Sequence, residues 1–388
     1  MWKYRGFFAL LYFIQGASLA YVINFQKPYL AGHGIAKETL GLFTAVLLIP
    51  FILKIFIGML SDRVPLGRLG SRKPYMALGL GLFAVAYLAL SQVNPGADFP
   101  LFAGLAWLGA LGLATFDTCA DGWAVDIAEE QEQSAIQAAM ISGKSMGLIL
   151  MSFGFGVVAE RSGFGLVFQT LAILSFLVLV VVMFVPYRPR PRVTESLVKD
   201  WGDLLKVFYV LFAIFGVVYS IASFGTDGLL TLHLTDVHHA SNRDLGFFGV
   251  CRGIGALIGA ALYVLSFRRM GIRNAQFVAL LALGCGCLIP LMNLSLPATG
   301  ILWGMCWGFQ ETAFVTLAMR FAEGAWAASF FAMSMIFSNL GTSLGEMLAA
   351  PLVPRFGYNA VFVAFALVAW SCLFFVPKMM QPVHSEAI

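Results

Sequence analysis

Charge is the property that this sequence has least of. Of its 388 residues, 11% are Asp, Glu, Lys or Arg, whereas 60% are hydrophobic. A soluble domain carries roughly 25% charged and 45–50% apolar residues. The composition therefore excludes a soluble protein and indicates an integral membrane protein. The basic residues are also too scattered to form the clustered face that binds nucleic acid.

Several chemical signatures are missing as well. No G-x-x-x-x-G-K-S/T stretch is present, which argues against an ATP-driven pump, and no nucleophile–base arrangement points to an enzyme. The six cysteines all fall in apolar segments without zinc-like spacing to His, so we expect no disulfide, metal site or cofactor. The segment TLHLTDVHHASNRD (231–244) has the side chains for a metal site, but a solvated outer loop is the simpler interpretation.

Long hydrophobic segments, by contrast, fill the chain. A membrane-spanning helix needs about 20 mainly apolar residues, and twelve segments meet this requirement. Ser134-Ala-Ile-Gln137 has the pattern of a capping box and favours a helix start there. The predicted spans are 6–25, 39–60, 74–92, 99–125, 134–158, 164–186, 204–225, 245–266, 274–292, 298–319, 325–349 and 358–377. The predicted fold class is thus an all-α membrane protein.

The loops predict the orientation and the division into domains. The loops and ends on one side hold most Lys and Arg, whereas the opposite side holds few. Basic loops stay in the cytoplasm, so we expect both termini there, with the protein in a bacterial inner membrane. The longest polar interruption predicts a linker at 188–203, between six-helix bundles at 1–187 and 204–388.

Weak internal symmetry supports two related halves. LSDR at 60–63 returns as LSFR at 265–268, and Gly143-x-x-x-Gly147 has a counterpart in Gly341-x-x-x-Gly345. Repeated halves are typical of secondary transporters, whose solute site lies between them. The glycine pairs alone are equally explained by close helix packing, which small residues favour in any membrane protein.

The stretch GMLSDRVPLGRLGSRKP (58–74) resembles the loop signature of the major facilitator superfamily. The wider stretch 49–75, together with LYFIQG (11–16) and FFAMSMIFSNLGTSLG (330–345), resembles the folate–biopterin transporter branch. These stretches are also similar to the related muropeptide permeases, acetyl-CoA transporters and siderophore importers. The resemblance covers the whole chain and implies twelve helices in two pseudo-symmetric bundles.

The same resemblance implies a cytoplasmic gate. In the superfamily this loop latches the two halves, and Asp62 would engage the start of the eleventh span, whose positive dipole end favours an anion. For Arg68, Arg72 and Lys73, orientation and contact with lipid headgroups are the preferred interpretation. The gate residues implied by the motif are Gly58, Asp62, Arg63, Arg68, Arg72 and Lys73.

Three carboxylates interrupt the fourth span in DTCADGWAVD (117–126). Asp117 and Asp121 are four residues apart and share a helix face, and Lys144 on the next span lies at a similar depth. We therefore predict that Asp117, Asp121 and Lys144 couple transport to protons, with one of the two acids as the proton carrier, and a fixed polar brace is the alternative. Asp126 lies near the helix end, where a structural role is expected.

Other polar residues at membrane depth are candidates for the solute pathway or for proton coupling. Buried charges usually face a cavity or a partner. Glu311 joins the proton-coupling candidates, Arg252 is expected to pair with Glu311 or Glu346, and Lys54 either attracts an anionic solute or extends to the interface. Helix packing is the alternative for the uncharged residues. The pathway candidates are Gln15, Asn24, Lys54, Arg252, Gln310, Asn339 and Glu346.

The sequence thus predicts a secondary active transporter for a small organic solute, expected to be anionic and proton-coupled. The expected partners are that solute, protons and the lipid bilayer, with the protein acting as a monomer. The alternative is a membrane assembly factor or receptor of the same fold without transport. The co-occurrence of Asp117, Asp121, Lys144 and Glu311 favours the transporter.

Overall fold

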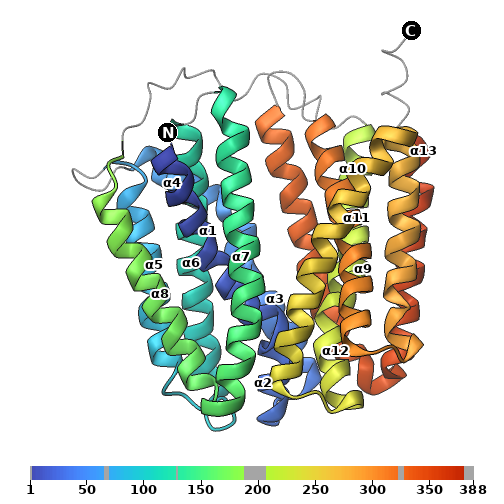
Figure 1. The fold of residues 1–388 in the computed structure, drawn as a ribbon, viewed down its shortest axis with the longest axis horizontal. Coiled ribbons are helices and arrows are strands. Elements are labelled where there is room, and N and C mark those ends of the chain that lie inside the picture. Colours follow the sequence, from blue (N-terminus) through green and yellow to red (C-terminus); the bar gives the residue numbers. More distant parts are fainter. Residues whose placement is uncertain (1, 65–69, 128–129, 188–206, 322–326, 380–388) are drawn as a thin grey trace. The chain divides into compact units, whose positions relative to one another are not determined.

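The computed structural model describes residues 2–64, 70–127, 130–187, 207–321 and 327–379. These residues form helices joined by short connections, and no strand occurs among them. Nine helices of this described part are long and apolar enough to cross a membrane. Figure 1 shows the helical ribbon coloured along the sequence.

The chain forms two compact units. The first contains Met1–Ile35, Val46–Thr194 and His239–Val250, and the second contains Ala36–Ala45, Glu195–His238 and Cys251–Ile388. Each unit therefore includes one short segment from the half of the sequence that mainly forms the other unit: His239–Val250 in the first unit and Ala36–Ala45 in the second. Within the first unit, α1 packs along α7, and α5 packs against both α6 and α8. In the second unit, α9 packs along α12.

The helices have the following bounds. Those before the midpoint are α1 (Trp2–Asn24), α2 (Gln26–Gly32), α3 (Lys37–Ile52), α4 (Lys54–Arg63), α5 (Lys73–Leu90), α6 (Phe99–Ile127), α7 (Glu130–Ser162) and α8 (Phe164–Phe184). Those after it are α9 (Val207–His238), α10 (Asn242–Cys287), η3 (Ile289–Met292), α11 (Leu296–Phe321), α12 (Ala327–Ser371), η5 (Cys372–Phe374) and α13 (Val376–Met379).

Glycine divides the two longest helices into the expected pairs of spans. α10 has 46 residues, which is about 69 Å of straight helix, more than twice the hydrocarbon core of about 30 Å. Gly271 interrupts it with φ 74°, and Gly357 interrupts α12 with φ 77°. Because glycine lacks a Cβ, it adopts this left-handed conformation readily. α10 and α12 each count as two spans, divided at these glycines, and α3 and α4 together count as one. The helices then give the twelve-helix fold that the sequence predicts.

Two sequence-based boundaries are wrong. α7 begins at Glu130, so Ser134 lies inside the helix and cannot cap it. α9 continues to His238, whereas the sequence predicted a span that ends at 225 and a solvated loop beyond. His233 is accordingly buried, and its ring contacts Tyr358 and Phe362.

The paired glycines lie where helices meet. A Cβ on Gly143 would lie 2.0 Å from the Ala9 carbonyl oxygen of α1, and one on Gly147 would lie 2.2 Å from that of Phe13. In the second unit, the Cβ of Gly341 would lie 2.3 Å from the Val217 carbonyl oxygen of α9. The two motifs thus make equivalent close contacts, α7 with α1 and α12 with α9.

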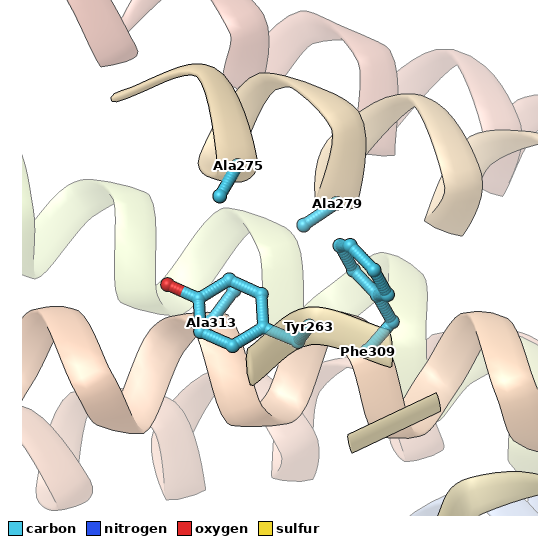
Figure 2. Close-up of a cluster of buried hydrophobic side chains, with 5 residues drawn as sticks. All are labelled: Tyr263, Ala275, Ala279, Phe309 and Ala313. Carbon is cyan, nitrogen blue, oxygen red and sulfur yellow. The ribbon is translucent and has the colours of Figure 1, made fainter. Parts of the chain in front are cut away.

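The second copy of the loop motif is apolar in the structure. Phe267, which replaces the acid of the first copy, packs against a buried cluster formed by Tyr263, Ala275, Ala279, Phe309 and Ala313 (Figure 2). The rings of Phe267 and Tyr263 are stacked, 6.2 Å apart. At the position of Phe267, the second copy of the motif is thus held by hydrophobic packing.

Candidate functional site

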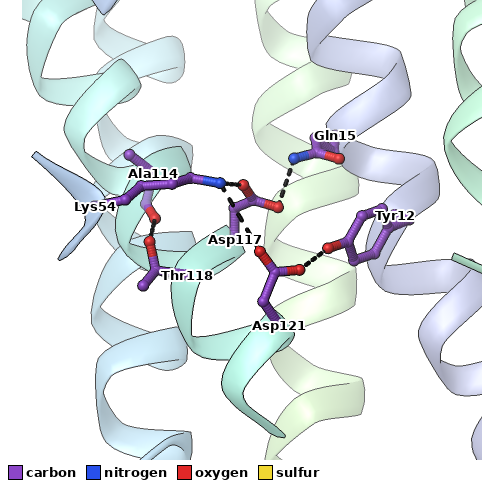
Figure 3. A network of polar contacts seen from close by, with 7 residues as sticks. All are labelled: Tyr12, Gln15, Lys54, Ala114, Asp117, Thr118 and Asp121. Atoms are coloured by element: carbon purple, nitrogen blue, oxygen red, sulfur yellow. Dashed lines mark hydrogen bonds and ion pairs between the residues drawn. The ribbon is translucent and has the colours of Figure 1, made fainter. Parts of the chain in front are cut away.

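Asp117 is a carboxylate buried inside the first unit. It lies on α6 and is only 2% exposed. One carboxylate oxygen accepts a hydrogen bond of 2.5 Å from Gln15 Nε2 on α1, and the other accepts one from Lys54 Nζ on α4 (Figure 3). A buried charge is stable only when it is paired and hydrogen-bonded, and Asp117 meets both conditions.

Asp121 lies one helical turn further along α6, where its side chain is more exposed. Its side chain is 49% exposed, and its Oδ2 lies 3.9 Å from Lys54 Nζ. Its other oxygen accepts a hydrogen bond from the Tyr12 hydroxyl (Figure 3). One ammonium group therefore serves two carboxylates, of which one is enclosed and the other is accessible.

A break in the second span places Lys54 in this cluster. Pro50 lies inside α3, where its ring removes a backbone donor. α3 ends at Ile52, Leu53 forms a turn, and α4 begins at Lys54. The second span is therefore interrupted locally, directly before the residue that contacts the two acids.

Lys144 is the second cation of the cluster, but it does not contact the acids. It attracts Asp121 and repels Lys54 electrostatically. Among the described residues it forms no hydrogen bond and no ion pair within 4.0 Å. The sequence favoured Lys144 as the partner of the two acids, whereas the structure brings Lys54 to them. We define the charged cluster as Lys54, Asp117, Asp121 and Lys144.

Asp126, the third acid of the stretch, belongs to a separate buried contact. It accepts hydrogen bonds from Arg72 Nε at 3.0 Å and from the Tyr187 hydroxyl at 2.5 Å. Arg72 also donates to Ser61 Oγ at 2.5 Å. Burial, together with the hydrogen bond to Asp126, raises the pKa of Tyr187 to about 12, so this hydroxyl stays protonated and donates.

The other residues of the expected gate occupy different surroundings. Gly58 faces Thr118 of α6, whose Cγ2 would lie 3.5 Å from an added Cβ. Lys73 is buried, and its Nζ donates to the Met183 carbonyl at 3.1 Å. Arg63 is exposed. Arg68 and the side chain of Asp62 lie outside the described residues.

The second unit holds Glu311 among hydroxyl groups. Tyr219 and Ser223, both on α9, donate to its two oxygens at 3.5 and 3.4 Å. The Tyr219 hydroxyl also lies 3.2 Å from Ser338 Oγ on α12. The neighbouring Gln310 is fully buried and accepts a hydrogen bond of 3.2 Å from Gln276. Glu311 is thus held by weak, neutral donors.

Arg252 forms a buried ion pair with Asp227, an acid that the sequence analysis did not name. Its Nη1 lies 2.9 Å from each oxygen of Asp227, and Trp303 Nε1 donates to the same carboxylate at 2.7 Å. The expected pairing of Arg252 with Glu311 or Glu346 stays a prediction. Asp227 was overlooked because the predicted span ended at 225, although an acid two residues beyond a hydrophobic segment was a usable signal.

The remaining pathway candidates lie on α1 and α12. Asn24 is buried and donates to Ser152 Oγ at 2.8 Å between α1 and α7. Asn339 and Glu346 lie half-buried on α12. Tyr12 was missed, although its position three residues before Gln15 places both on one face of α1. Within the described residues, no group of three or more His, Cys, Asp or Glu side chains can hold a metal ion.

Known proteins resemble this chain in sequence and in fold. It is 23% identical over 375 residues to the anhydromuropeptide permease of Escherichia coli (strain K12), covering 91% of this chain and 75% of the permease. It is 28% identical over 157 residues to "Putative transporter AmpG 4" of Rickettsia conorii, covering 40% of this chain and 38% of that protein. The match therefore spans well under half the length of the Rickettsia relative.

Solved structures agree on the architecture. The nucleoside transporter NupG superposes with a TM-score of 0.74 at 15% identity, over 97% of this chain and 98% of that chain. At this identity the likeness concerns the fold alone. The sequence profile of the Major Facilitator Superfamily matches residues 8–346, and the chain accordingly belongs to this superfamily of multi-pass membrane transporters.

Proposed function

We propose that this protein is a proton-coupled secondary transporter that carries a small organic anion by alternating access. The observation that carries the proposal is the charged cluster, in which Lys54 contacts both Asp117 and Asp121. Ionisable residues inside a membrane are costly and mark ion pathways and proton relays. A bacterial inner membrane with both termini in the cytoplasm is the setting that the loop charges favour.

The environments of the two acids suggest a division of roles. Asp117 is enclosed and fixed by Gln15 and Lys54, which suits a permanent counter-ion. Asp121 is 49% exposed, so water can deliver and remove a proton there. Asp121 is thus the proton-exchanging residue of the proposal, and Asp117 the residue that holds Lys54.

The charge of the cluster and the names of similar proteins suggest which class of solute to test. Two lysines at membrane depth suit a solute with carboxylates. Both curated relatives above carry names that point to transport, and one is named for anhydromuropeptides. Anhydromuropeptides are therefore the first solutes to test, ahead of folates, pterins, siderophores and acyl-CoA esters.

The experiment is uptake of a labelled anhydromuropeptide into proteoliposomes under an imposed pH gradient. The wild type should accumulate the solute, whereas Asp121→Asn should lose gradient-driven accumulation by at least about tenfold, because the amide cannot carry a proton. Asp98→Asn is the matched control, since Asp98 is exposed at the start of the same helix. Solute binding without any flux would instead identify a receptor and contradict the proposal.

A further inference from the structure

We propose that Lys54 is the solute-binding residue and that a proton on Asp121 frees it to bind a solute carboxylate. This inference rests on the proposed function and specifies the solute chemistry of the same site. It follows from how many charges the cluster holds, from which groups contact one another, and from where Lys54 lies on its helix.

The charges of the cluster balance when every member is ionised. Four titratable groups surround Asp121: Tyr12 on α1, Lys54 on α4, Asp117 on the preceding turn of α6, and Lys144 on α7. Two of them are cations, and Tyr12 is a neutral donor. Lys54 and Lys144 offset Asp117 and Asp121, so the empty site has no charge to attract an anion.

A proton on Asp121 destroys this balance. Lys54 and Lys144 already repel each other electrostatically, and Asp121 is the carboxylate that attracts both. Once it is neutral, two positive charges face the single negative charge of Asp117. Charge interactions are several times stronger in a protein interior than in water, so the excess positive charge favours the entry of an anion.

Lys54 is placed to receive that anion. Its side chain is 29% exposed, whereas Asp117 beneath it is enclosed. It also lies at the interruption between α3 and α4, directly after Leu53. A solute carboxylate would take over the contact that Lys54 makes with Asp121, while Asp117 keeps its own contact with the ammonium group.

Proton binding and anion binding then favour each other. A solute carboxylate restores the neutral state, so the proton and the carboxylate travel together. By linkage, the solute's dissociation constant should rise by up to about tenfold per pH unit once Asp121 ionises. Without the proton, Asp121 competes with the solute for Lys54.

Binding of a labelled anhydromuropeptide to purified protein, measured across pH, tests this inference. The wild type should bind more weakly as pH rises, whereas Asp121→Asn should bind equally well at all pH values, because its amide mimics the protonated acid. Asp121→Asn should also retain solute exchange across proteoliposomes, which needs no net proton movement. Lys54→Gln should lose binding by at least about tenfold, and Lys378→Gln, on the exposed Lys378, is its control.

Failure of this inference is distinguishable from failure of the proposed function. If the wild type shows proton-driven uptake but Asp121→Asn keeps the wild-type pH dependence of binding, the inference is overturned and the proposed function stands. Wild-type binding by Lys54→Gln would likewise overturn the inference and leave the proposed function standing. The pH profile of Asp121→Asn decides the question even if Lys54→Gln fails to fold. Absence of proton-driven uptake in the wild type overturns both.

Discussion

Asp117, Asp121 and Asp126 lie within ten residues of one helix, and their surroundings give them different chemistry. Asp117 is enclosed with Lys54 and Gln15, Asp121 is half exposed, and Asp126 is buried against Arg72. The three carboxylates have different partners, and the side chain of Asp121 is far more exposed than the other two, so the same side chain can serve different purposes. Asp126 is a structural anchor in this account.

Removal of Arg72 should destabilise the first unit. Arg72→Ala leaves Asp126 buried without its cation, which typically costs about 3–5 kcal/mol. Thermal unfolding of detergent-solubilised protein measures the loss. Arg63→Ala is the control, because the Arg63 side chain is exposed and its removal should change the midpoint little. Equal midpoints for the two variants would contradict the assigned role of Arg72.

The buried ion pair of the second unit gives a subtler prediction. Trp303→Phe keeps the ring but removes the N–H that donates to Asp227 at 2.7 Å. A hydrogen bond to a charged group contributes about 1.5–3 kcal/mol, so the unfolding midpoint should fall measurably. Trp370→Phe removes a longer bond of 3.4 Å to the Leu281 carbonyl and should have less effect. The reverse order of the two midpoints would count against the Asp227 contact.

At the residue scale, the sequence predicted groups on one helix better than contacts between helices. Asp117 and Asp121 share a face because of the helical repeat alone. Their contact with Lys54 depends on the break at Leu53 and on which helix packs against α6. Neither is a local property. From the sequence, Lys144 looked like a suitable partner for the two acids, because the sequence indicates the depth of a residue in the membrane but not its contacts.

At the scale of elements, glycine spacing controls how closely helices approach. Gly143→Ala would place a Cβ 2.0 Å from the Ala9 carbonyl oxygen, whereas Gly154→Ala meets nothing within 4 Å. Both glycines lie on α7, so their helix propensities match. We expect Gly143→Ala to lower the unfolding midpoint strongly, because α1 and α7 must separate, and Gly154→Ala to leave it unchanged or higher. Equal effects would contradict the close α1–α7 contact.

Hydropathy predicted the elements well because membrane spans need long apolar segments. It failed at boundaries where polar residues belong to helices. α9 extends through Asp227 to His238, since Arg252 and Trp303 satisfy the acid inside the unit. The break between α3 and α4 was missed for the opposite reason, because the interrupted segment is apolar apart from Lys54.

At the scale of the whole molecule, the distribution of basic residues predicts the orientation. A C-terminal fusion to green fluorescent protein should fluoresce in bacteria, whereas a fusion to alkaline phosphatase, which is active only outside the cytoplasm, should be inactive. The physical reason is that Lys- and Arg-rich loops resist translocation. An active phosphatase fusion would show that the C-terminus lies on the other side.

The central claim is that solute and proton move together through the charged cluster. The most direct measurement is the pH of a weakly buffered medium when an anhydromuropeptide is added to proteoliposomes without any imposed gradient. The account predicts that the medium becomes more alkaline with the wild type, as protons enter with the solute. With Asp121→Asn it should not change. Solute entry through the wild-type protein with no change in external pH would contradict the account.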